Sequence, residues 1–128
     1  MVIGVIIVNH GSRLAQSNQL IEQAAAQLHE RFPADYPIVE PAHMELNEPS
    51  VSSAYSRCVE RGATRIVICL YFIGPGKHST HDIPRLAAQA QQQHPQTTYQ
   101  ITATLGLDEL MLQLLHKRIT ESTSNLPA

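Results

Sequence analysis

The sequence predicts an α/β protein with a flavodoxin-like open parallel sheet of four strands, ordered 2-1-3-4, with helices on both faces. Short runs rich in Val and Ile alternate with longer segments whose apolar residues recur at helical spacing. This alternation favours a parallel sheet with right-handed crossovers. The strand that contains Pro41 is expected at an edge, because proline cannot donate to a strand ladder. Strands 1 and 3 should therefore lie side by side.

Composition limits the classes of protein that fit. The 128 residues suit one domain, expected over residues 1–119 and followed by a polar tail over 120–128. The net charge of −2 gives no basic excess for general nucleic-acid binding. No apolar segment approaches the roughly 20 residues of a membrane span. Cys58 and Cys69 lie in apolar segments without a cysteine cluster, as free thiols do in a reducing compartment, so we expect a cytoplasmic protein.

The first half of the chain predicts a strand, a helix and a second strand. Residues 2–9 are apolar without polar alternation, the pattern of a central parallel strand covered on both faces. After a loop, residues 15–32 place apolar side chains three, four and seven apart, which defines one helical face. Pro33 ends that helix. The second strand is expected over 38–46.

The second half predicts two further strands and three further helices. The strands are expected over an apolar run at 65–73 and an alternating segment at 98–104. Gly62 is placed to cap the C-terminus of the helix that precedes the first of these. The three helices are expected to begin at residues 47–50, Asp82 and Asp108.

Two histidines follow adjacent strands of the predicted sheet. The order 2-1-3-4 directs the loops that carry His10 and His78 to one crevice, at the carboxyl ends of strands 1 and 3. Two neutral imidazoles would form an incomplete shell for Co²⁺, Ni²⁺, Fe²⁺ or Zn²⁺. Such a shell suits a metal that is held and then transferred, whereas a structural site would be closed. The alternative is an ordinary hydrogen-bonded loop histidine at each position.

Other polar side chains near this crevice have more than one interpretation. Glu45, at the end of strand 2, is a general base, a temporary binding position for the cation, or a plain strand-end carboxylate next to a helix. His43 would share a strand face with Glu45, as a core histidine bonded to it or as a group that supports the site. His81 lies three residues after His78, and a capping or surface role is favoured over a shared ion.

The two loops also carry residues suited to anions. Ser12 and Arg13 follow Gly11, and Gly76 is followed by Lys77, each just before a predicted helix N-terminus. The sequence contains neither a GxxxxGK[ST] loop nor a GxGxxG loop. We therefore expect an anion-binding rim and no nucleotide.

Three motifs in order resemble one known family. Residues 10–13, HGSR, resemble the opening motif of the CbiX/SirB sirohydrochlorin chelatases. Residues 44–46 resemble the acidic element of that family, and 71–78 with 82–84 resemble its second signature. The resemblance covers most of the chain, from Val2 to about Ile119. HGSR alone is a weak motif, but the ordered set is specific.

The resemblance implies an activity and a site. Class II chelatases of this type insert a divalent metal into sirohydrochlorin without ATP: cobalt for cobalamin, iron for siroheme, nickel for coenzyme F430. Co²⁺ is favoured here, followed by Fe²⁺, with Ni²⁺ also open. By motif, His10 and His78 would bind the metal, and Glu45 would occupy the acidic position. Arg13 and Lys77 would face the carboxylate-rich macrocycle. Short members of the family are homodimers, which implies the same here.

Two other classes of protein fit the same pattern. A tetrapyrrole or metal carrier on this scaffold would bind ligand without turnover. A flavodoxin-like interaction domain would carry the histidines incidentally. Turnover of a tetrapyrrole separates the chelatase from both.

Overall fold

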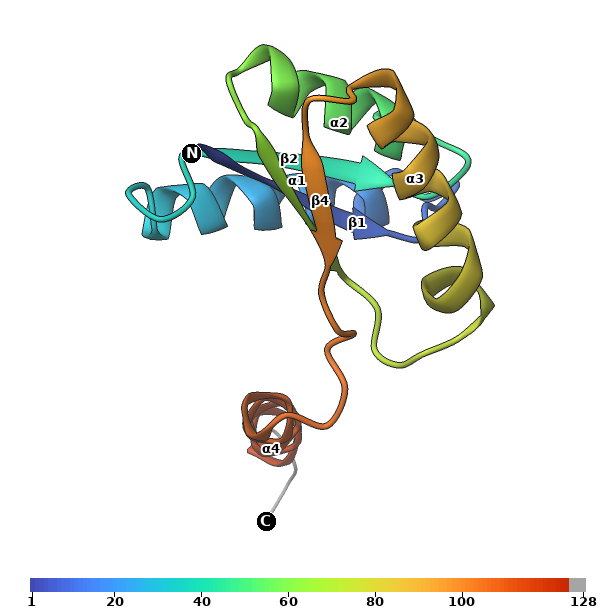
Figure 1. The fold of residues 1–128 in the computed structure, drawn as a ribbon. Coiled ribbons are helices and arrows are strands. Elements are labelled where there is room, and N and C mark those ends of the chain that lie inside the picture. Colours follow the sequence, from blue (N-terminus) through green and yellow to red (C-terminus); the bar gives the residue numbers. More distant parts are fainter. Residues whose placement is uncertain (125–128) are drawn as a thin grey trace.

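The sheet has the predicted order. In the computed structural model, which describes residues 1–124 apart from the side chain of His78, four parallel strands are ordered β2-β1-β3-β4 (Figure 1). The edge position of β2 is thus confirmed, Pro41 included. The strands are β1 (Ile3–Asn9), β2 (Ile38–His43), β3 (Arg65–Leu70) and β4 (Thr98–Ile101).

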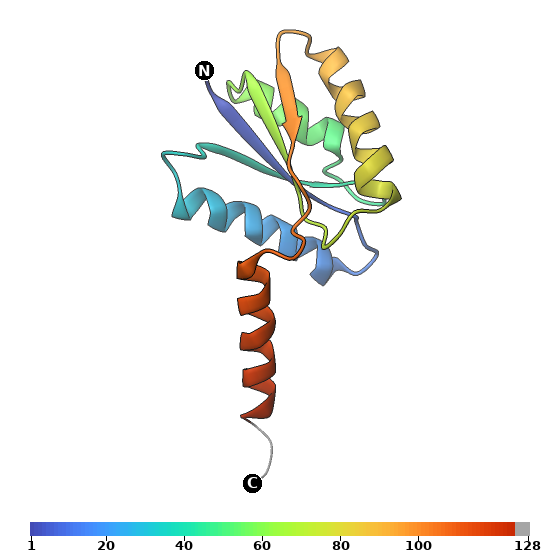
Figure 2. The same ribbon diagram turned by 60° about the horizontal axis from the view of Figure 1, so that its bottom comes forward.

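Helices cover both faces of the sheet, as expected. α2 and α3 lie on one face and α1 on the other (Figure 2). Alternation along β1 explains both contacts, since Ile6 and Val8 pack with α2 and α3 whereas Val5 and Ile7 pack with α1. The helices are α1 (Ala15–Arg31), α2 (Val51–Glu60), α3 (Ile83–Gln93) and α4 (Glu109–Thr123).

Three of the strands end earlier than the sequence predicted. Apolar residues continue past the last ladder bond, so composition alone does not mark the end of a strand. β2 shows the physical cause most clearly: Leu46 has a φ of 74°, which turns the chain away from an extended path. The predicted ends were Leu46, Ile73 and Thr104, and the observed ends are His43, Leu70 and Ile101.

Most of the predicted helix boundaries are confirmed. Ser50 caps α2 by accepting a hydrogen bond from the amide of Ser53, and Asp108 caps α4 by accepting one from Leu110. Gly62 follows α2 with a φ of 103°. The expected cap at Asp82 is wrong. Helical structure already begins in the π-helical turn His78–Asp82, so no cap is needed at its end.

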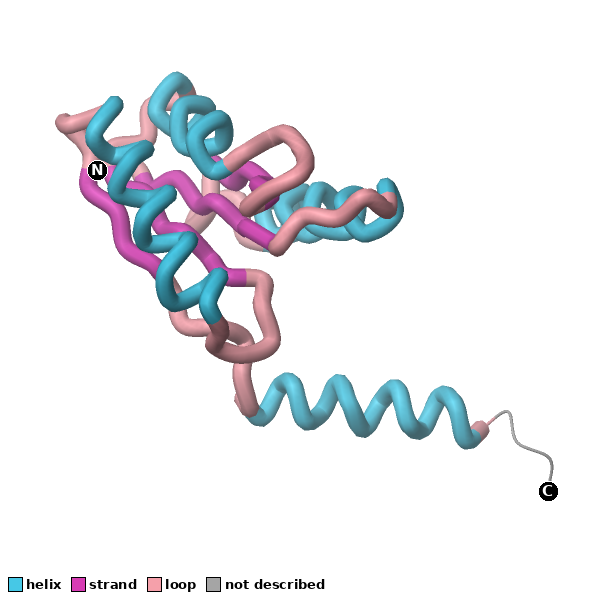
Figure 3. The backbone as a smooth tube through the Cα atoms, turned by 90° about the vertical axis from the view of Figure 1, so that its right-hand side faces the viewer, coloured by secondary structure: helices cyan, strands magenta, loops and turns pink. Residues whose placement is uncertain are grey.

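α4 stands apart from the sheet. It leads away from the end of β4 as a single helix (Figures 1–3) and buries none of its residues. The helix continues to Thr123, past the start of the tail expected at Thr120; residues 125–128 lie outside the described part of the chain. The domain boundary at residue 119 stays a prediction. Over the described residues, no helix has the length and apolar character to cross a membrane.

Candidate active site

The chain beyond β2 stays hydrogen-bonded to the backbone at the end of β1. After the ladder ends, the amide of Met44 donates to the carbonyl of Asn9 at 2.9 Å. The amide of Glu45 donates to the carbonyl of His10 at 3.2 Å. These two bonds place Glu45 directly beside His10, at the carboxyl end of the strand pair.

Gly11 permits this close approach. Its φ is 100°, and a Cβ at this position would lie 2.0 Å from the carbonyl oxygen of Glu45. No residue with a side chain fits, on grounds of both space and backbone conformation. The Gly that follows His10 therefore holds the two loops against each other.

His10 and Glu45 form a polar pair. The Nε2 atom of His10 lies 3.0 Å from Oε1 of Glu45, with the two side chains 46% and 48% exposed. With Nε2 protonated, the carboxylate can accept a hydrogen bond from it, which orients the ring. Carboxylate–histidine pairs of this kind orient histidine ligands in metal sites. The pair can also accept protons.

The loop after β1 is anchored by side chains that sequence reasoning did not identify. Asn18 of α1 holds Ser12 by two bonds, one to its carbonyl at 2.7 Å and one from its amide at 3.1 Å. Asn47 also donates to the carbonyl of Ser12. Because the Ser12 amide is already bonded, it is not available to bind an anion, contrary to the simplest form of the predicted rim. Nothing in the sequence pattern marks Asn18 or Asn47 for this role.

The loop after β3 is more open. His78 begins the π-helical turn, and its side chain lies outside the described part of the structure. The remaining predicted residues of the rim, Arg13, Gly76 and Lys77, are exposed, as is His81. A surface position for His81 agrees with the favoured interpretation.

Two cavities open beside these loops. The first, the His10 cavity, has a volume of about 370 Å³ and lies between the end of β1, the start of α1 and the chain after β3. The second, the α4 cavity, has a volume of about 450 Å³ and lies against α4. Tyr71 borders both. The His10 cavity is lined by Asn9, His10, Gly11, Ser12, Ser17, Leu20, Ile21, Tyr71, Phe72 and Ile73.

His43 is placed differently from the expectation that linked it to Glu45. β2 ends at His43, so the two residues no longer share a strand face. The ring is 1% exposed, and its Nδ1 lies 2.7 Å from Oδ1 of Asn9. Burial lowers the pKa of His43 below its ordinary value, and the negative charge of Glu22 acts weakly in the opposite direction.

The residues that could hold a cation form an open set. Among the described residues, no group of three or more His, Cys, Asp or Glu side chains is placed to hold a metal ion. His10 and Glu45 alone leave most of a coordination shell open. Such a set suits a metal in transit rather than a closed structural site.

The fold and this open site define a class of protein, and comparison with known sequences agrees. The sequence model of the CbiX family matches residues 4–122, and the chain belongs to this family. A sirohydrochlorin ferrochelatase of the chloroplast from Arabidopsis thaliana is 45% identical over 96% of this chain and 54% of its own length.

Solved structures show the same fold. The sirohydrochlorin chelatase SirB from Bacillus subtilis subspecies spizizenii, in complex with cobalt, superposes with a TM-score of 0.83 at 26% identity, over 94% of this chain and 51% of that one. A CbiX protein from Marinobacter aquaeolei VT8 superposes with a TM-score of 0.78 at 21% identity, over 97% and 99%. The chain thus spans about half the length of the Arabidopsis and Bacillus relatives.

Proposed function

We propose that this protein inserts a divalent metal, Co²⁺ or Fe²⁺, into sirohydrochlorin without ATP. The observation that carries the proposal is the His10–Glu45 pair, 3.0 Å apart at the sheet edge and beside an open cavity, in a chain of the CbiX family. The Arabidopsis relative is named for iron and the Bacillus structure holds cobalt, which supports both metals as candidate substrates.

Each residue has a role in this proposal. The imidazole of His10 binds the incoming cation, with His78 as the second imidazole, and Glu45 holds the His10 ring in position. The cation replaces two pyrrole N–H protons of the macrocycle, so the reaction releases two protons. Glu45, half exposed beside His10, is placed to accept them and pass them to solvent.

The shape and charge of the site support a flat, carboxylate-rich substrate. The loop between β3 and the π-helical turn is exposed, so a macrocycle can approach the His10 cavity without a buried passage. Arg13 and Lys77 are exposed cations on the two loops. They would attract substrate carboxylates from solvent, and salt would weaken this attraction.

The test is anaerobic absorbance spectroscopy of sirohydrochlorin with Co²⁺, Fe²⁺ or Ni²⁺, with and without the protein. We expect the protein to accelerate insertion over the uncatalysed rate. The catalysed rate should be at least about 100-fold lower in His10→Ala than in wild type. Spectral changes from tetrapyrrole binding without acceleration would favour a carrier instead. An unchanged rate in His10→Ala would remove His10 from the reaction.

We further propose that the active form is a homodimer assembled through α4. Apolar side chains occupy several sides of this helix, with exposed fractions between 41% and 86%. A helix that is apolar on several sides is normally buried. The side chains are Leu107 just before the helix and Leu110, Leu112, Leu114, Leu115 and Ile119 within it.

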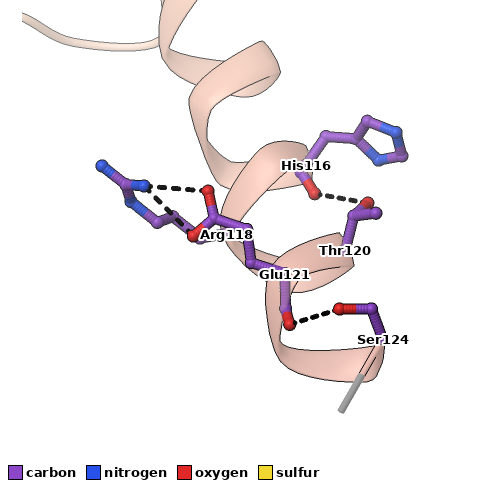
Figure 4. Close-up of polar contacts among 5 residues, drawn as sticks. All are labelled: His116, Arg118, Thr120, Glu121 and Ser124. Carbon is purple, nitrogen blue, oxygen red and sulfur yellow. Dashed lines mark hydrogen bonds and ion pairs between the residues drawn. The ribbon is translucent and has the colours of Figure 1, made fainter.

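The polar contacts of α4 leave this apolar surface uncovered. Figure 4 shows that they remain local, with Arg118 paired to Glu121 at 3.1 Å and Thr120 bonded to the carbonyl of His116 at 2.9 Å. A second copy is the favoured occupant because the exposed apolar side chains of two identical helices could cover one another. The α4 cavity shares Tyr71 with the His10 cavity, so a partner seated on α4 would also affect the site.

Sedimentation velocity tests the dimer. We expect Leu115→Glu to shift the protein toward monomer and to reduce metal insertion by about ten-fold or more, since a buried charge opposes association. Gln113→Glu, an exposed polar position on the same helix, serves as the matched control and should stay dimeric. A fully active monomeric wild type would contradict the proposal. The cytoplasmic location stays a prediction, since the Arabidopsis relative is named for the chloroplast.

A further inference from the structure

Asn9, which directly precedes His10 in the chain, is paired with the buried His43 across β1 and β2. The two residues face each other in the register of β1 and β2, and Oδ1 of Asn9 lies 2.7 Å from Nδ1 of His43. An amide oxygen only accepts hydrogen bonds, so Nδ1 of His43 carries the proton and donates it. The ring is 1% exposed, which shields this bond from water.

The surroundings of the other ring nitrogen of His43 favour a neutral ring. Nε2 is buried, and no residue that the structure describes bonds to it. A charged ring would place an N–H donor and a positive charge there without an acceptor, which is more costly than a bare lone pair. The ring therefore has one tautomer, with its proton on Nδ1.

This tautomer fixes the amide of Asn9 in one orientation. Turning the amide over would set its NH₂ group against Nδ1–H, two donors facing each other. The Nδ2 group thus points away from His43, and no described residue accepts a hydrogen bond from it. Asn9 lines the His10 cavity together with His10 and Tyr71, so an oriented donor is available to a ligand there.

The chemistry of this donor selects its ligand. A metal ion cannot use it, because Nδ2 has no lone pair to offer and Oδ1 is occupied by His43. The ligand must be a hydrogen-bond acceptor. On a macrocycle with many carboxylates, the strong acceptors are carboxylate oxygens.

We propose that Asn9 is a substrate-binding residue whose amide donates to a carboxylate of the tetrapyrrole, and that His43 is the positioning residue that holds the amide in this orientation. The inference rests on the proposed function, because it takes the tetrapyrrole as the ligand. Asn9 acts on the macrocycle and His10 on the cation, so the two neighbours in sequence serve different parts of the reaction.

Asn9→Asp provides the sharpest test. The substitution keeps an oxygen that accepts from His43, so the fold should persist, but it replaces the donor with a negative charge. We expect the dissociation constant for sirohydrochlorin, titrated by absorbance without metal, to rise at least about ten-fold. For Co²⁺ insertion we expect KM to rise by a similar factor, with kcat within about three-fold of wild type. An unchanged dissociation constant would overturn the inference.

His43 variants test the positioning role. His43→Phe removes the donor and lets the amide turn, so binding should weaken as in Asn9→Ala, and the double variant should be no weaker than Asn9→Ala alone. His43→Gln keeps a donor and should restore part of the affinity, judged beside thermal unfolding of each variant. Effects that multiply in the double variant would overturn the positioning role. A wild type that neither binds nor metallates sirohydrochlorin would defeat the proposed function itself.

Discussion

The two loops that carry the predicted histidines are held very differently. The loop after β1 is fixed on three sides: Gly11 against the backbone of Glu45, and Ser12 by Asn18 and Asn47. Among the described contacts, the loop after β3 is tied to the rest of the chain at its start, where the carbonyls of Phe72 and Ile73 accept hydrogen bonds from the chain after β4.

Beyond that point, residues 73–77 are exposed. Among the described contacts, Gly76 bonds to Ser79 and Thr80 of the following turn. The fold itself therefore positions His10 and Glu45, whereas the loop after β3 is accessible from solvent. In the proposed reaction, the firmly held loop after β1 would bind the cation, and the open loop after β3 would admit the macrocycle.

Alanine substitutions of one glycine in each loop should show the largest difference in stability between the two loops. A Cβ at Gly11 would collide with the carbonyl of Glu45 at 2.0 Å in a backbone conformation of positive φ, whereas a Cβ at Gly74 would meet no atom within 4 Å. We expect Gly11→Ala to lower the free energy of unfolding by more than about 2 kcal/mol and Gly74→Ala to change it by less than about 0.5 kcal/mol. Urea unfolding measures both. Equal effects would mean that the β1 loop is not held as described.

A smaller effect is expected at Glu45. Glu45→Gln keeps an oxygen that accepts from Nε2 of His10 but removes the charge that accepts protons. We expect the rate of Co²⁺ insertion to fall by about ten-fold, with stability unchanged, because supporting carboxylates of histidine ligands typically contribute that much. Glu60→Gln, at an exposed position on α2, is the control. A rate equal to that of wild type would leave Glu45 as a structural partner only.

The smallest expected effect is the loss of stability that His43 causes at acidic pH. Because the pKa of His43 is lowered in the folded state from 6.5, the unfolded chain binds this proton first as pH falls. Its contribution to stability is thus complete above about pH 6.5 and declines below it, by at most about 1.4 kcal/mol per pH unit for one proton. Urea unfolding at pH 8 and pH 5 should show a smaller pH dependence in His43→Gln than in wild type or in His116→Gln. Equal slopes in all three would contradict this assignment.

The sequence was sufficient for the architecture because strong local signals agreed. Pro41 placed β2 at the edge and the apolar run of β1 placed it at the centre; the order 2-1-3-4 then followed from the flavodoxin-like pattern, and the structure confirms it. The ends of the strands were less predictable, since apolar composition continues through segments such as 71–73 after the ladder has ended. The cap expected at Asp82 failed because a π-helical turn has no distinctive composition.

The sequence predicted that His10 and Glu45 would lie near each other but not how they make contact, and their roles in a site stay predictions. The convergence of strands β1 and β2 brought Glu45 near His10, but the 3.0 Å contact depends on a backbone approach that spacing does not reveal. Of the two interpretations of His43, the bond to Glu45 is wrong because the length of β2 was overestimated, and the role of a supporting group stays open. Asn9 could have been noticed as the polar residue that ends an apolar strand. The role of His78 stays a prediction.

The contact between Gly11 and the Glu45 carbonyl makes the segment from His43 to Ser50 a spacer of fixed length. Side chains such as that of Leu46, 62% exposed, can change without moving this backbone. An inserted or deleted residue would shift the Glu45 carbonyl against Gly11 and carry His10 with it. Variants of this segment should therefore replace side chains at constant length, whereas the exposed loop after β3 is the better place to insert additional residues.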